Sequence, residues 1–205
     1  SLTSLVLSHN FIKNVNFSLN SLSNLNVLSL DFNEIYTVEK HLVVNSLKLV
    51  DLHLNNNKFF RVPSFIENFQ ILKFLDLGEN FIKNLSDLES LANLKYLYGL
   101  RLTENQIESL ERNHFTHLKN LQIVNLSKNR IRHIDRESFG SNEFLQAIRL
   151  DGNSIKNIDY MFENLTQLVF MNISENSLEI FDYENFPKNL QFLDISKNQI
   201  NVVKN

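Results

Sequence analysis

A few residues have the types and spacing that chemistry would need, but none of these groups is complete. His114 and His117 are three residues apart, a spacing that could serve a metal ion, yet they have no obvious carboxylate companion. Asp76 and Glu79 are paired acids, but no pocket is implied around them. Ser127 has no histidine placed to activate it. We therefore predict that the chain is not an enzyme, has no catalytic or metal-ligating residues, and needs no cofactor.

The largest group of basic residues lies between positions 119 and 136. It consists of Lys119, Lys128, Arg130, Arg132, His133 and Arg136. Phosphate binding needs such charges, but Asp135 interrupts the group and no aromatic side chains alternate with it as a base-stacking platform. The net charge of −3 gives no general attraction to nucleic acid or anionic membranes. We therefore do not expect the chain to bind nucleic acid. No apolar run approaches the roughly 20 residues of a membrane span, so we expect no membrane contact.

The composition points to the elements that must position these side chains. The 205 residues include 34 Leu and 31 Asn but only four Gly, two Pro and no Cys. The chain begins with the pattern Leu2-x-x-Leu5-x-Leu7-x-x-Asn10-x-Ile12-x-x-Val15. Eight further copies follow, and the fixed asparagines are 22 to 25 positions apart. These nine asparagines are Asn10, Asn33, Asn57, Asn80, Asn105, Asn129, Asn153, Asn176 and Asn198.

Each copy predicts one short β-strand. In Leu5-Val6-Leu7 the outer residues point to one side and the middle residue to the other, as strand geometry requires. A single copy cannot bury its own leucines, whereas stacked copies share a continuous core. Parallel strands about 4.8 Å apart would then form one long sheet face.

This pattern is the signature of leucine-rich repeats, and the resemblance covers essentially the whole chain. It implies an α/β fold: a curved horseshoe solenoid with one parallel strand per repeat on the concave face and an irregular or short helical convex side. We expect a single array of nine repeats over residues 1–205. Neither end carries a polar capping segment, so we expect a fragment of a longer array.

The resemblance also gives roles to the fixed asparagines and to a row of phenylalanines. In the family, the Asn side chain is buried and bonds backbone groups of adjacent turns, and leaving such an amide unpaired costs about 1–3 kcal/mol. A stacked Phe row lies on the convex side, and its expected members are Phe115, Phe139, Phe162 and Phe186. Phe65 or Ile66 would fill this slot in the third repeat, and Leu19 or Phe17 in the first.

Two repeats depart from the regular pattern in their second halves. The second repeat, around residues 41–44, does not follow it. The fourth repeat is the longest, and Leu88, Leu91 and Leu94 are spaced by three residues. That spacing predicts a helical turn or two.

The outward strand positions differ from copy to copy while the inward positions barely change, which suits a surface that binds a partner. Repeats two to five present a mostly acidic field with aromatic residues and one Arg, and repeats eight and nine present two Phe residues. The residue mix is typical of protein interfaces. The candidate ligand-binding residues are Asp51, His53, Phe74, Asp76, Tyr98, Arg101, Glu104, Arg149, Phe170 and Phe192. The alternative is a plain solvated sheet face.

Five asparagines occur in the Asn-x-Ser/Thr pattern that accepts N-linked glycans. They are Asn16, Asn84, Asn125, Asn164 and Asn172. A sequence with so many asparagines contains several matches to this pattern by chance. Asn125 and Asn172 fall on the outward face, where glycans would confine a partner to the N-terminal half of the arc or to its sides.

The repeat length and the Phe row resemble the typical extracellular class of leucine-rich repeats. Residues 180–195 resemble a segment of arthropod Toll receptor ectodomains, in which Phe-Asp-Tyr precedes a Pro and a Leu-x-x-Leu-Asp repeat start. The Gly-Asn-Tyr that follows in that family is replaced by Val203-Lys204-Asn205.

The Toll resemblance implies a single-pass receptor with a cytoplasmic signalling domain. The chain would be part of its ligand-binding ectodomain, outside the plasma membrane or secreted, with a protein ligand or co-receptor as partner and dimerisation as the signalling step. Two alternatives stay open: a secreted or matrix leucine-rich repeat adaptor, and a regulatory repeat domain of an intracellular multidomain protein.

Overall fold

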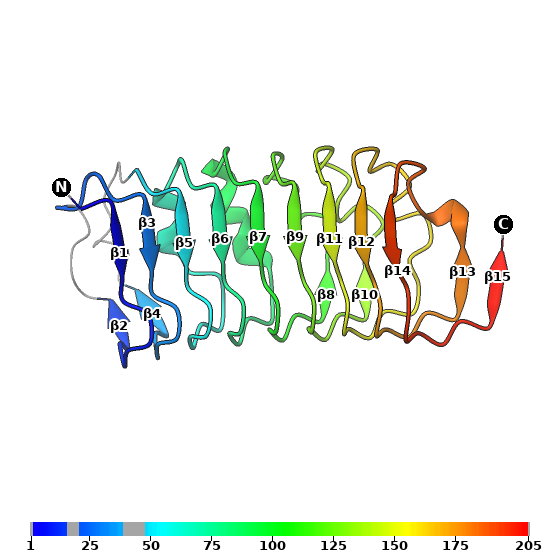
Figure 1. Ribbon diagram of the computed structural model, residues 1–205, viewed down its shortest axis with the longest axis horizontal. Coiled ribbons are helices and arrows are strands. Elements are labelled where there is room, and N and C mark those ends of the chain that lie inside the picture. The colour runs from blue at the N-terminus through cyan, green and yellow to red at the C-terminus, as the bar shows by residue number, and fades with distance from the viewer. Residues whose placement is uncertain (1, 16–20, 39–47, 205) are drawn as a thin grey trace.

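The computed structural model describes residues 2–15, 21–38 and 48–204. Within them, nine short parallel strands form one sheet in which each strand neighbours the strands of the adjacent repeats (Figure 1). These strands are β1 (Ser4–Val6), β3 (Val27–Ser29), β5 (Asp51–His53), β6 (Phe74–Asp76), β7 (Gly99–Arg101), β9 (Ile123–Asn125), β11 (Ala147–Arg149), β12 (Phe170–Asn172) and β14 (Phe192–Asp194). The predicted solenoid of parallel strands is confirmed.

Equivalent repeat positions stack directly on one another along the sheet. Leu5 pairs with Leu28, and Leu28 with Leu52, so the inward leucines form one continuous row. From the second repeat to the eighth, this row is fully or almost fully buried. The outward rows are in the same register, and one of them runs from Val6 through Ser29 to Asp194.

Three two-stranded parallel ladders lie outside the main sheet, two of them below its strands in the view of Figure 1 and one beyond its C-terminal end. They pair β2 (Asn14–Val15) with β4 (Thr37–Val38), β8 (Ser109–Leu110) with β10 (His133–Ile134), and β13 (Ile180–Asp182) with β15 (Val202–Lys204). Short 3-10 helices complete the turns at η2 (Ser64–Asn68), η3 (Ser86–Asn93) and η4 (Tyr183–Asn185). No helix in the described ranges has the length and apolar character needed to cross a bilayer.

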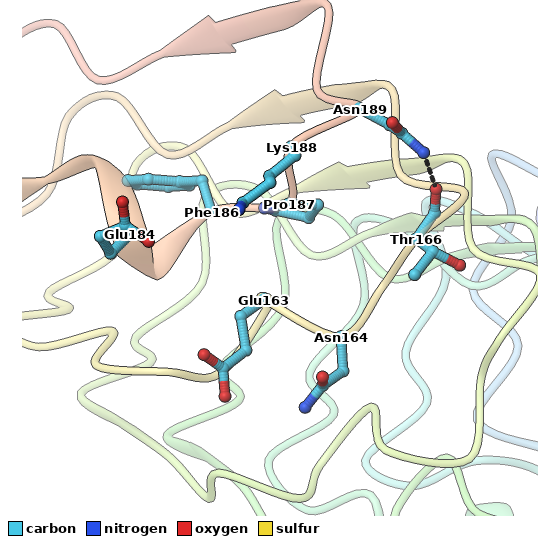
Figure 2. A pocket seen from close by; sticks show the side chains of 8 residues that line it. All are labelled: Glu163, Asn164, Thr166, Glu184, Phe186, Pro187, Lys188 and Asn189. Carbon is cyan, nitrogen blue, oxygen red and sulfur yellow. Dashed lines mark hydrogen bonds between the residues drawn. The ribbon is translucent and has the colours of Figure 1, made fainter.

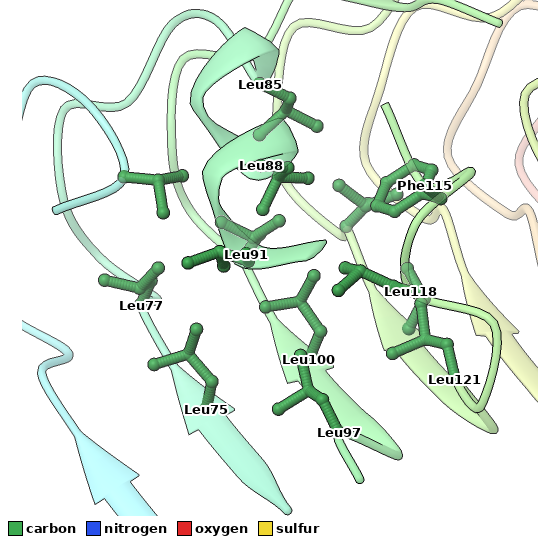
Figure 3. Packing of buried hydrophobic residues seen from close by; sticks show 14 of the residues in the cluster. Leu75, Leu77, Leu85, Leu88, Leu91, Leu97, Leu100, Phe115, Leu118 and Leu121 are labelled. Carbon is green, nitrogen blue, oxygen red and sulfur yellow. The ribbon is translucent and has the colours of Figure 1, made fainter. Parts of the chain in front are cut away.

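The long fourth repeat contains the helix that its leucine spacing predicts. Leu88 and Leu91 lie in η3 and are buried, and Leu94 is buried directly after it. Figure 3 shows Leu88 and Leu91 of this helix packed among the leucines of the neighbouring turns, with Leu85 directly before the helix. A spacing of three residues matches the three residues per turn of a 3-10 helix, so its apolar side chains share one face.

The expected Phe row is present on the side opposite the sheet. The rings of Phe115 and Phe139 stack with centroids 5.1 Å apart, and those of Phe139 and Phe162 are 6.1 Å apart. Phe186 is also buried. In the third repeat, both candidates for this slot, at positions 65 and 66, are buried in η2. The first-repeat candidates Leu19 and Phe17, and the second-repeat segment 41–44, lie outside the described residues.

The fixed asparagines form a ladder of hydrogen bonds between turns. In Asn105, Oδ1 accepts from the backbone N–H of Ile82 at 2.9 Å, in the preceding turn. Its Nδ2 donates to the carbonyl of Leu77 at 2.9 Å, also in the preceding turn, and to Leu102 at 3.2 Å in its own turn. The same bonds recur from the second repeat to the ninth. Asn10 is exposed and donates only within its own turn, to Leu7 and Ser8.

The residue before every ladder asparagine has a left-handed backbone, with φ between 53° and 68°. These residues are His9, Phe32, Asn56, Glu79, Glu104, Lys128, Gly152, Glu175 and Lys197. Only Gly152 is free of the Cβ crowding that makes this conformation cost about 1–2 kcal/mol in other residues. The turn after each strand therefore has the same backbone conformation in every repeat. The type of residue at this position does not predict it.

Replacing Asn105 with Ala should destabilise the array by about 1–3 kcal/mol for each backbone group left buried and unpaired. The matched control is Asn10→Ala in this same chain, because Asn10 has the same place in its repeat but donates only within its own turn. Chemical denaturation followed by circular dichroism compares the two. Equal losses of unfolding free energy would contradict the role assigned to the bonds between turns.

Candidate functional site

We use the term sheet face for the two outward rows of side chains on the nine-stranded sheet. The first row is Ser4, Val27, Asp51, Phe74, Gly99, Ile123, Ala147, Phe170 and Phe192. The second row is Val6, Ser29, His53, Asp76, Arg101, Asn125, Arg149, Asn172 and Asp194. Strand alternation places both rows toward solvent and the leucines between them in the core.

The N-terminal half of the sheet face carries an aromatic cluster that is packed into position. The rings of His53 and Phe74 are 5.8 Å apart and inclined by 47°. Phe74 also lies across the backbone of Gly99 on the next strand: a Cβ there would be 2.6 Å from the ring carbon Cδ2. Gly99 thus provides the space in which the ring is held. Tyr98, just before it, is exposed.

Asp76 is in the predicted row, but its carboxylate lies beneath the surface. It is only 5% exposed, and Oδ1 accepts from the N–H of Gly78 at 2.9 Å. Its Oδ2 accepts from Nη1 of Arg101 at 2.9 Å, and Nη2 of Arg101 lies 3.8 Å from Oε1 of Glu79. We predicted Asp76 as a partner contact. Its burial makes it a support instead, because it fixes the half-buried guanidinium of Arg101 at the surface.

Of the remaining charged candidates, Glu104 and Arg149 are paired within the chain, and Asp51 is not. Glu104 precedes a ladder asparagine, at the edge of the sheet, and its Oε1 lies 2.7 Å from Nζ of Lys128. The hydrogen bond and charge of Glu104 raise the pKa of Lys128. Arg149 bonds Asp151 in its own repeat at 3.3 Å. Asp51 is half-buried in the row beside Phe74 and has no ion pair among the described residues. The acidic field is thus weaker than composition suggests.

The predicted basic group does not form one cationic surface. Lys128 is bound to Glu104, as above. Arg136 contacts Glu163 at 3.3 Å and lies over the ring of Tyr160, 5.6 Å from its centroid. Arg130 and Arg132 are exposed on the turn after the strand. These contacts leave a scattered set of cations.

The C-terminal half of the sheet face carries an apolar strip. Phe170 and Phe192 stack face to face with centroids 4.7 Å apart and planes 4° apart, and Phe192 is 49% exposed. The same row continues through Ala147 to Ile123, which is 44% exposed. The structure thus brings the two predicted Phe residues together and extends them over four strands.

A polar cluster at the N-terminal end escaped the sequence analysis. The hydroxyl of Ser8 donates to Oδ1 of Asp31 at 2.8 Å and lies 2.6 Å from the hydroxyl of Ser29, which also donates to Asp31. Burial raises the pKa of the Asp31 carboxyl, but the hydrogen bonds from Ser29 and Ser8 lower it more, so the net shift is downward. Ser8 and Asp31 hold equivalent positions in adjacent repeats, with Ser29 two residues before Asp31, and this arrangement is the signal that could have revealed the cluster.

The repeats and the comparisons with known proteins agree. A family model described as leucine rich repeat matches residues 96–155, inside the nine-stranded region. The chain belongs to the leucine-rich repeat family. In this family the sheet face and the turns at its edges are both available for binding, because the core lies wholly between the sheet and the Phe row.

The similar proteins include Toll receptors. This leucine-rich repeat array is 50% identical to Toll-like receptor 7 of Drosophila melanogaster over 144 residues, which are 70% of the chain and 10% of that receptor. The TLR13–ssRNA13 complex matches with a TM-score of 0.84 and 23% identity, covering 94% of this chain and 28% of the other. The Drosophila Toll–Spatzle complex matches with a TM-score of 0.78 and 23% identity, covering 98% and 32%. These two structures support the fold.

The two histidines with the spacing of metal ligands have different surroundings. Nδ1 of the buried His114 accepts the backbone N–H of Glu111 at 3.1 Å, which closes a turn of the array. His117 is exposed. The described residues contain no group of three or more His, Cys, Asp or Glu side chains that could hold a metal ion.

The predicted glycan acceptors differ in their surroundings. Asn84 and Asn164 are exposed in turns outside the main sheet. Asn125 and Asn172 are half-buried on the sheet face, where each Oδ1 accepts the N–H and hydroxyl of the serine two residues later. Asn16 lies outside the described residues.

Asn164 borders a hollow of about 380 Å³ between the turns of two repeats. Its side chain points away from the segment that contains Pro187, to the same side as that of Glu163, into open space (Figure 2). On the far side, Nδ2 of Asn189 donates to the carbonyl of Thr166 at 2.7 Å. The backbone carbonyl of Asn164 accepts from the N–H of Thr166 at 2.9 Å, but its side-chain amide has no hydrogen-bond partner among the described residues and is accessible.

The turn closed by His114 should make stability depend on pH. Burial lowers the pKa of His114, and the Glu111 carboxylate opposes this with a smaller upward effect. The stabilisation is therefore complete above the unfolded pKa of about 6.5 and is lost as the pH falls through the lower folded pKa. Between about pH 7.5 and about pH 5, the melting temperature should fall more for the wild type than for His114→Gln. His117→Gln is the control and should retain the wild-type slope; identical slopes for all three proteins would refute the assignment.

Proposed function

We propose that this leucine-rich repeat array is part of the ligand-binding ectodomain of a Toll-like receptor, on the extracellular side of the plasma membrane. The 50% identity to Toll-like receptor 7 of Drosophila melanogaster supports the receptor class. The chain spans about a tenth of that receptor's length, so the proposal concerns one segment of a larger protein. The partner we propose is a protein ligand or co-receptor, with receptor dimerisation as the consequence of binding.

The observation that carries the proposed binding role is the packed arrangement on the N-terminal half of the sheet face. Phe74 is seated on Gly99, and Arg101 is held by the buried Asp76. Aromatic and Arg side chains dominate the energetics of protein interfaces. Side chains that are already fixed lose less conformational entropy when a partner binds. This half of the face is therefore prepared for a protein contact.

Asn172 favours the N-terminal half over the apolar strip, whereas Asn125 is next to both Arg101 and Ile123 and favours neither. Asn172 follows Phe170 on the same strand, so a glycan there would screen the apolar strip from a large partner. No predicted acceptor lies among Phe74, Asp76 and Arg101. We propose that the protein ligand contacts the sheet face around Phe74 and Arg101. Phe170 and Phe192 would form a secondary contact surface.

Spatzle, the protein named in the matched Toll complex, is the first ligand to test. In biolayer interferometry with the parent ectodomain, Phe74→Ser combined with Arg101→Ser should weaken binding by about tenfold or more, because a few aromatic and Arg residues carry most interface energy. Phe170→Ser with Phe192→Ser should weaken it less. Phe144→Ser, which removes an exposed Phe outside the sheet strands, is the control. Unchanged affinity for the first variant would place the contact elsewhere.

An extracellular location has its own test. Asn164 should carry an N-linked glycan in the native protein, because its amide is exposed and has open space in front of it. Enzymatic deglycosylation in ¹⁸O-labelled water converts an occupied Asn to labelled Asp, which peptide mass spectrometry detects. Asn84 serves as a second exposed acceptor. Unmodified Asn164 and Asn84 in the native protein would argue strongly against secretion.

A further inference from the structure

A second surface lies in the turns that follow the strands of the first four repeats, along the edge to which the arrow of β14 points in Figure 1. We define the aromatic flank as Tyr36, Phe60, Arg61, Phe81 and Lys83. These residues follow ladder asparagines by one, three or four positions and lie outside the main sheet. They are separate from the sheet face and from every candidate contact discussed above.

The later repeats show that the fold does not need aromatic residues at these places. The aromatics one or three positions after a ladder asparagine are Phe11, Tyr36, Phe60 and Phe81, which are 86%, 52%, 67% and 40% exposed. From the fifth repeat on, the same two positions hold only polar residues: Gln106, Glu108, Arg130, Arg132, Ser154, Lys156, Ser177, Glu179, Gln199 and Asn201. Those repeats form the same strands and ladder bonds. The aromatic side chains therefore serve something other than the solenoid.

The members of the flank form a continuous surface over three repeats. The rings of Phe60 and Phe81 stack with centroids 5.6 Å apart and planes 26° apart. Tyr36 and Phe60 both line a hollow of about 290 Å³, together with Arg61 and Pro63. Exposed apolar groups that gather in this way mark interaction sites more often than scattered ones do.

The charges around the aromatics indicate what the surface binds. Arg61 and Lys83 are exposed and form no ion pair with any residue that the structure describes. Of the nearby acids, Glu34 is already bound to Lys58 at 3.0 Å, and Glu108 and Glu111 line a hollow together with Lys83 without an ion pair to it. The flank therefore has unpaired positive charge beside apolar rings and a hollow large enough for a side chain. Charge complementarity calls for an acidic partner.

Within acidic partners, the geometry favours a protein over a nucleic acid. Bases bind by stacking on the open faces of aromatic rings, and the stacking of Phe60 on Phe81 covers one face of each ring. A hollow between a Tyr and a Phe with an Arg at its rim has the residue types that are enriched at the centre of protein interfaces. We propose that the aromatic flank is a second protein-binding surface, which receives an acidic segment of a partner protein and inserts one of its aromatic side chains into the hollow.

The test uses a fluorescein-labelled random copolymer of Glu and Tyr as the probe, with fluorescence anisotropy as the readout at about 0.15 M ionic strength, where distant charges are screened. The whole chain should bind the copolymer. Phe60→Ser with Phe81→Ser, and separately Arg61→Glu with Lys83→Glu, should each weaken binding by about tenfold or more. The matched control is Arg132→Glu with Lys156→Glu, the same change of charge at polar positions in later repeats, and should change the affinity less than about twofold. Thermal melts verify that every variant is folded.

Four results would overturn the proposal. The first is no binding of the copolymer by the wild type. The second is wild-type affinity in the variant that lacks Phe60 and Phe81. The third is an equal loss in the Arg132 and Lys156 control, and the fourth is tighter binding of oligo(dT) or of poly-Glu than of the copolymer. Because no sheet-face residue is altered, failure here leaves the proposed ligand-binding role of the sheet face standing.

Discussion

In each turn that follows a strand, one backbone N–H and one carbonyl, such as those of Ile12 and Leu7, bond the side chain of the ladder asparagine in the next turn. Its amide accepts from the preceding turn and donates to two turns, as a backbone peptide unit would. Because one side chain bonds both turns at fixed distances, neighbouring repeats cannot slip against each other. Register, and with it every row of outward side chains, depends on this bond. The seat of Phe74 on Gly99 and the stack of Phe170 on Phe192 exist because equivalent positions are held one strand apart.

The periodic part of the structure could be predicted from the sequence. Leu and Asn spacing gave the inward row, the outward rows and the Phe row, because these depend only on position within a repeat. Contacts between neighbouring repeats could not be predicted in the same way. The burial of Asp76 depends on Arg101 in the next repeat, and the cluster at Asp31 depends on Ser8 in the previous one. The left-handed residue before each ladder asparagine also escaped, since Phe32, Glu79 and Lys128 carry no local sign of it.

Charge on this solenoid is largely balanced from turn to turn. Glu34 pairs with Lys58, Glu104 with Lys128, and Glu175 with Lys197, each one repeat apart. Exposed pairs of this kind contribute roughly 0–1 kcal/mol to stability, so their main effect is on which charges remain available to a partner. The sheet face keeps a supported Arg101, and the aromatic flank keeps Arg61 and Lys83. The two surfaces therefore differ in the positive side chains that the ion pairs between repeats leave available to a partner.

The ladder also has a direction. Every asparagine amide reaches back toward the amino terminus: Asn198 receives the N–H of Leu178, and Asn33 receives that of Ile12. When a turn at the carboxyl-terminal side unfolds, the turn before it is left with an orphaned donor and carbonyl. When a turn at the amino-terminal side unfolds, the next turn loses backbone acceptors such as the carbonyl of Thr3, to which the N–H of Asn26 donates. The ladder asparagine of that next turn stays in place, and its amide becomes hydrated. Loss of a terminal turn therefore has different effects on the ladder at the two ends. Each turn depends on the asparagine of the following turn for these hydrogen bonds.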